Sequence, residues 1–165
     1  HYYPESEKDF YKHLHFIKEK LDFCKDEFVH TDNTEWSTGI TEKYQQIVIP
    51  ASGTLYLDLI EEGTVILFDY NQRALDYWEE KLTKKEKIKY KFINTNLLNE
   101  TNLVDYLDPN LKTLINLSNI FCYEGTVAQY SLQHRLTAQN NLVESLEDKI
   151  KDITINFTMK ANSGH

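Results

Sequence analysis

Two short apolar runs, each followed by turn or polar residues, constrain the fold of this chain more than any other feature. The first run, residues 47–49, breaks at Pro50 into the small-residue turn 51–53. The second run, residues 65–68, ends on Asp69 and is followed by an amphipathic pattern. Short apolar runs bounded by turn residues and joined by helical patterns are typical of parallel strands covered on both faces. Ligands of such sheets bind beyond the carboxyl ends of the strands, so this pattern predicts a nucleotide or nucleoside pocket at Asp69 and the turn.

The remaining segments predict a doubly wound order of elements. Apolar residues in 5–23 are spaced by four, three and four, which indicates an amphipathic N-terminal helix, and the polar residues 29–44 indicate a lid loop. Further along we expect a helix over 71–82 capped by Asn71, a strand at 88–93, a short helix at 101–107, a strand at 114–117, a long helix over 126–150 with room for a break, and a strand at 153–159. This order predicts an α/β fold, a three-layer doubly wound and mostly parallel sheet of about five strands with an N-terminal helix.

Size and charge limit the classes of partner. The 165 residues fit a single domain, with the N-terminal helix and lid loop in 1–45 and the sheet core in 46–159. A net charge of −8 disfavours long contacts with nucleic-acid phosphates. No apolar run approaches the roughly 20 residues of a membrane-spanning helix, and the sequence as given does not open with a signal peptide. Cys24 and Cys122 lack a CxxC partner, so we expect reduced thiols and a cytoplasmic location. The acidic charge favours a small-molecule substrate over nucleic acid, and the lack of a long apolar run leads us to expect no membrane partner.

The order of elements in residues 46–159 resembles that of class I S-adenosylmethionine-dependent methyltransferases. In that family a glycine-rich loop after the first strand lies beneath the methionine part of the cofactor, and an acid ending the second strand binds the ribose hydroxyls. The end of the third strand contacts the adenine, and the end of the fourth faces the methyl group and the substrate. The resemblance implies S-adenosylmethionine contacts at these ends: Pro50, Ala51, Ser52 and Gly53, then Asp69, Tyr70 and Asn71, then Asn94 and Asn96, then Ser118 and Asn119.

Candidate catalytic residues follow the fourth predicted strand. Tyr123 and Glu124 stand where a general base or a substrate-orienting group would lie, and His134 falls in the long helix that would cover the pocket. The plain alternative is that Tyr123 and Glu124 are surface residues on a loop and that His134, next to Arg135, is a solvated or core-edge residue. His30 and Asp32 have the spacing of two iron ligands in 2-oxoglutarate oxygenases, but those enzymes have an antiparallel jelly-roll fold, which the parallel-strand pattern contradicts. We expect no metal site.

Two functions of different classes remain open. The first is an S-adenosylmethionine-binding, methyltransferase-like domain that transfers a methyl group to a small or sugar-like acceptor. The second is a non-catalytic Rossmann-like module for assembly or partner binding, in an oligomer or a larger assembly. The second reading is favoured by the single glycine in 50–53 and by the lack of a final pair of antiparallel strands. An iron- and 2-oxoglutarate-dependent oxygenase is a distant third.

Overall fold

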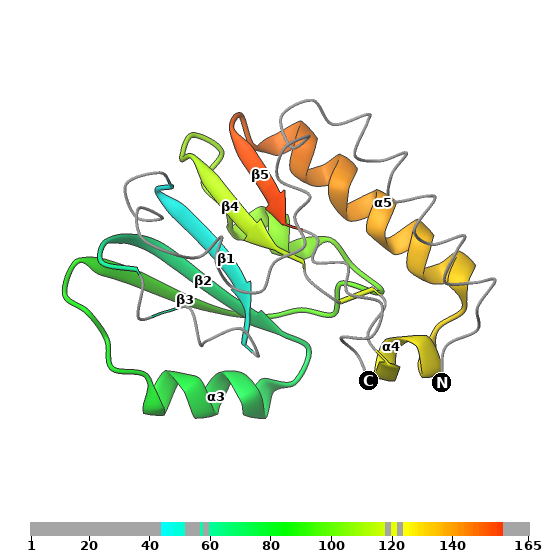
Figure 1. Ribbon diagram of the computed structural model, residues 1–165, viewed down its shortest axis with the longest axis horizontal. Helices are drawn as coiled ribbons and strands as arrows, with labels where there is room; N and C mark the ends of the chain where they lie inside the picture. Colours follow the sequence, from blue (N-terminus) through cyan, green and yellow to red (C-terminus); the bar gives the residue numbers. More distant parts are fainter. Residues whose placement is uncertain (1–43, 52–56, 58–59, 118–119, 122–123, 157–165) are drawn as a thin grey trace.

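A single parallel sheet forms the centre of the molecule (Figure 1). The computed structural model describes residues 44–51, 57, 60–117, 120–121 and 124–156. The strand order is β3-β2-β1-β4-β5, and all four neighbouring pairs are parallel. The strands are β1 (Gln46–Pro50), β2 (Gly63–Asp69), β3 (Ile88–Asn94), β4 (Thr113–Asn116) and β5 (Ile153–Asn156). The predicted α/β fold with a parallel sheet of about five strands is confirmed, whereas the helix expected at 5–23, most of the lid loop and residues 157–159 lie outside the described residues.

Helices cover both faces of the sheet (Figure 1). They are α3 (Gln72–Lys81), the 3-10 helix η4 (Asn102–Tyr106), α4 (Glu124–Gln129) and α5 (Leu132–Lys149). Helix α3 begins as the sequence predicts, because the Asn71 side chain accepts a hydrogen bond of 3.0 Å from the Arg73 N–H. None of the described helices combines the length and the apolar character that crossing a membrane requires.

The long helix expected over 126–150 is divided into α4 and α5 by a break at Tyr130 and Ser131. Ser131 has an extended backbone (φ −64°, ψ 160°), and its Oγ accepts from the His134 N–H at 3.1 Å. A serine in this geometry caps a new helix, because it satisfies an N–H group that has no partner inside the helix. The break therefore places the first turn of α5 near the loop that follows β3, where His134 contacts Leu98.

Alternating residues of the central strands supply two separate cores. Val48 packs with Ile66, Ile115 and the buried face of α5, while its neighbours Ile47 and Ile49 pack on the opposite face with Leu75 of α3. Side chains of successive strand residues point to opposite faces, so β1 must be apolar at each of these positions. This requirement explains the continuous apolar run that the sequence shows.

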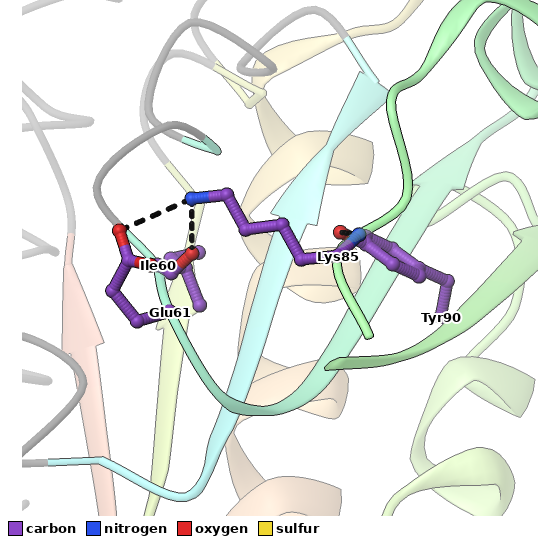
Figure 2. Close-up of polar contacts among 4 residues, drawn as sticks. All are labelled: Ile60, Glu61, Lys85 and Tyr90. Atoms are coloured by element: carbon purple, nitrogen blue, oxygen red, sulfur yellow. Dashed lines mark hydrogen bonds and ion pairs between the residues drawn. The ribbon is translucent and has the colours of Figure 1, made fainter. Parts of the chain in front are cut away.

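Polar contacts fix the amino-terminal edge of the sheet. The Lys85 ammonium donates to the Ile60 carbonyl at 2.7 Å and to the Glu61 carboxylate at 3.2 Å, and the Lys85 backbone N–H donates to the Tyr90 hydroxyl at 3.0 Å (Figure 2). The loop after α3 is thereby joined to the segment that enters β2. Gly63, the first residue of β2, has a φ of +111°, and a Cβ built there would lie 2.8 Å from the Gln45 carbonyl oxygen. Glycine is required at this close approach of two backbones.

Candidate functional site

The strand order places a topological switch point between β1 and β4. The chain runs outward from β1 through β2 to β3, and then continues with β4 on the other side of β1. In open parallel sheets, ligands bind in the crevice outside the carboxyl ends of the strands at such a point. Pro50 pairs with Phe68 in the register of β1 and β2, so Asp69 lies beside Ala51, the first residue after β1. The acid of β2 and the start of the turn after β1 are therefore neighbours at the carboxyl edge.

Asp69 is oriented by its own turn. Its Oδ1 accepts a 2.8 Å hydrogen bond from the Asn71 N–H, and the residue is only partly buried. Within the described part of the chain this is the one contact of the Asp69 carboxylate. The second oxygen, Oδ2, is thus able to accept a hydrogen bond from a ligand. Tyr70, the next residue, is 74% exposed.

Asn94 ends β3 directly beside Asp69 in the sheet register. Its Nδ2 donates to the Asp69 carbonyl at 3.2 Å and to the Tyr70 carbonyl at 3.1 Å. The Thr95 N–H gives the Asp69 carbonyl a further hydrogen bond of 3.0 Å. The amide hydrogens of Asn94 are therefore directed at the turn after β2.

Asn96 is engaged in a similar way. Its Oδ1 accepts from the Leu98 N–H at 3.0 Å, and its Nδ2 donates to the Tyr130 hydroxyl at 3.2 Å. Its backbone N–H donates to a carboxylate oxygen of Glu100 at 3.0 Å. These contacts tie the end of β3 to the junction of α4 and α5. The side-chain carbonyl oxygen of Asn96 already accepts one hydrogen bond and has a second lone pair left. The adenine contact expected for Asn96 stays a prediction.

His134 lies in the first turn of α5, against the loop after β3. Its Nε2 is 2.5 Å from the Leu98 carbonyl oxygen, and its ring centre is 4.9 Å from that of Tyr130. Because a carbonyl can only accept, Nε2 must carry the hydrogen, and in a neutral imidazole Nδ1 is then the acceptor. In its neutral form His134 would therefore present Nδ1 as a hydrogen-bond acceptor, on the β3 side of the carboxyl edge.

The other predicted site residues differ in how far they are described. Pro50 is partly buried, and Ala51, at 1% exposure, packs in the α3-side core, so only its backbone can approach a ligand. Glu124 is the first residue of α4. Four residues lie outside the described part of the chain: Ser52, Gly53, Ser118 and Asn119. Tyr123 lies outside it too.

A groove of about 800 Å³ lies between the loop at 97–101 and α5. Its walls carry His134 and the exposed carboxylates of Glu144 and Asp148, among other polar side chains. None of the described residues predicted to bind the cofactor lines this groove. The groove runs along α5 beside the loop after β3, and its lining residues differ from those of the pocket predicted from the sequence.

Two buried polar residues of α5 were not singled out as buried from the sequence. Arg135 is 4% exposed and donates to the Phe121 carbonyl at 3.1 Å and to the Tyr130 carbonyl at 3.3 Å. Gln139 is fully buried, and neither its Nε2 nor its Oε1 has a hydrogen-bond partner within the described part of the chain. The sequence does carry a signal that these two side chains face the core. The spacing is four, three and four along Arg135, Gln139, Leu142 and Leu146, which places them on one face of a helix.

A metal centre is not formed by the described residues, since no three His, Cys, Asp or Glu side chains come together there. His30 and Asp32 lie outside them. The all-parallel sheet differs from the antiparallel jelly roll of the 2-oxoglutarate oxygenases. Comparisons with protein-family models, with curated proteins and with solved structures found no match for this chain.

Proposed function

We propose that this chain is a methyltransferase-like domain that binds S-adenosylmethionine across the carboxyl ends of β1 and β2. One observation carries the proposal: the acid that ends β2, Asp69, lies beside Ala51 next to the switch point of a parallel sheet. A carboxylate at that place can accept hydrogen bonds from the vicinal hydroxyls of a ribose. Oδ1 is held by the Asn71 N–H and Oδ2 makes no hydrogen bond to a described residue, so the carboxylate is both oriented and available. The exposed ring of Tyr70 offers a surface for the purine.

Methyl transfer from S-adenosylmethionine requires little chemical assistance from protein side chains. An acceptor oxygen or nitrogen attacks the sulfonium methyl group in line, the carbon–sulfur bond breaks, and S-adenosylhomocysteine leaves as a neutral thioether. The acceptor gives its proton to water or to a base, for which Tyr123, Glu124 and the Nδ1 of His134 are the candidates. Most of the rate then comes from alignment and the exclusion of water. The negative net charge favours a small or sugar-like acceptor over nucleic acid, and two cysteines without a CxxC motif fit a cytoplasmic protein.

A second candidate function is a non-catalytic module for assembly. It is favoured because the polar side chains at the carboxyl edge already form hydrogen bonds with other groups of the protein. Asn71 caps α3, Asn94 holds the turn after β2, and Asn96 binds Tyr130. Apart from Oδ2 of Asp69, the described polar side chains at this edge thus have hydrogen-bond partners within the protein.

Thermal unfolding with S-adenosylhomocysteine separates the two functions. A ligand at 100 times its Kd adds about 2.7 kcal/mol, which raises the midpoint of a domain of this size by roughly 5–11 °C. Asp69→Ala should remove the shift. Asp105→Ala makes the same charge change at an exposed position in η4 and should keep it. If millimolar ligand leaves the wild-type midpoint unchanged, the methyltransferase proposal fails, and sedimentation equilibrium should then reveal self-association.

A further inference from the structure

We propose that Asn94 is a positioning residue, which fixes the direction of the Asp69 carboxylate and does not itself contact the ligand. The two residues are neighbours across β2 and β3. The importance of this contact for ligand binding rests on the function proposed above. The mechanical coupling can be tested without any ligand.

The coupling runs through one peptide plane. The Tyr70 carbonyl and the Asn71 N–H belong to the same planar peptide unit. Asn94 Nδ2 holds the carbonyl end of this unit at 3.1 Å, and the N–H end donates to Asp69 Oδ1 at 2.8 Å. Fixing the carbonyl therefore fixes the direction of the N–H group, and the N–H group in turn sets the rotation of the carboxylate.

The Asp69 carbonyl is held from β3 as well. It accepts from Asn94 Nδ2 at 3.2 Å and from the Thr95 N–H at 3.0 Å, which occupy the two lone pairs of this oxygen. The peptide groups on both sides of Tyr70 are thus restrained by the end of the neighbouring strand.

The same contacts exclude Asn94 as a donor to the cofactor. A side-chain amide has two hydrogens, and both are directed at carbonyl oxygens of the turn. An aspartate of the same size would place two acceptors against those carbonyls. Asn94→Asp should therefore be at least as damaging to the turn as Asn94→Ala.

Hydrogen exchange of the Asn71 amide in the ligand-free protein tests the coupling directly. We expect Asn94→Ala and Asn94→Asp each to speed this exchange about tenfold, because the hydrogen bond to Asp69 opens more often. Asn99→Ala is the matched control, since the Asn99 amide contacts only the Tyr130 hydroxyl among described groups, at 3.5 Å, and it should leave the exchange of Asn71 unchanged. Unchanged exchange of Asn71 in both Asn94 variants, with the fold intact, overturns the inference.

A double-mutant cycle tests the consequence for binding. Asn94→Ala should weaken S-adenosylhomocysteine binding about five- to tenfold in the wild type and less than twofold in the Asp69→Asn background. An equal loss in the two backgrounds would mean that Asn94 contacts the ligand itself, which contradicts the positioning role. Absence of binding to the wild type would refute the proposed function, and the exchange of Asn71 would still decide whether Asn94 orients Asp69.

Discussion

Both polar atoms of the Gln139 side chain are buried without a hydrogen-bond partner among the residues that the structure describes. A buried amide without partners costs about 1–3 kcal/mol relative to an apolar side chain of similar shape. We therefore expect Gln139→Leu to raise the free energy of unfolding by about 1–3 kcal/mol in urea denaturation. Gln133→Leu, the same change on the exposed side of α5, should alter stability by no more than about 0.5 kcal/mol. A loss of stability in Gln139→Leu would contradict this prediction and would indicate that the amide binds an ordered water or a ligand.

The position of Asp69 could be predicted from the sequence, but the hydrogen bonds made by the asparagine side chains near it could not. Asp69 follows an apolar run directly, so its place at the end of a buried strand is a local property. Asn94 and Asn96 bind residues that are 24 and 34 positions away in the sequence. Such pairings depend on strand register and on the break before α5, and a single sequence carries no periodic signal for them.

In the loop after α3, we expect the contact made by the Lys85 side chain to contribute measurably to the free energy of unfolding. Replacing Lys85 by Met keeps the aliphatic stem but removes the hydrogen bonds to the Ile60 carbonyl and to Glu61 (Figure 2). The Lys85 side chain is 31% exposed, so water replaces part of what is lost, and we expect a destabilisation of about 1 kcal/mol. Lys87→Met removes the same charge from an exposed side chain of the same loop and should have almost no effect in chemical denaturation. Equal effects of the two variants would indicate that overall charge, and not this contact, is responsible.

The helices were predictable where their ends carry local signals. Asn71 caps α3 through its own side chain, as the sequence indicates, and α3 ends before Leu82. The segment before Asp108 and Pro109 is a 3-10 helix of five residues, and 3-10 geometry is common in short pieces of this kind. The exact place of the break between α4 and α5 was not predictable, because apolar residues at helical spacing lie on both sides of it: Val127 and Tyr130 are three apart, and Leu132 and Leu136 are four apart.

At the scale of the whole molecule, the sheet joins two cores that share the same strands. Ile47 and Ile49 belong to the core under α3, and Val48 belongs to the core under α5. Neither face can lose its packing without exposing strand residues that also hold the other face. The parallel sheet covered on both faces was therefore predictable from the apolar runs and the helical spacing between them, while the pairing of buried polar groups within those cores was not.

This arrangement predicts one cooperative unfolding transition. Leu75 and Leu142 are buried in opposite cores, with 1% and 0% exposure. Truncating either to Ala should cost about 2–5 kcal/mol, because each change removes apolar contacts and leaves a cavity. Intrinsic fluorescence and far-UV circular dichroism should report the same midpoint for each variant, and the two costs should add in the double variant. A separate early transition in Leu75→Ala would show instead that the α3 face melts alone, since the strands would then keep their packing against α5 after the first core is lost.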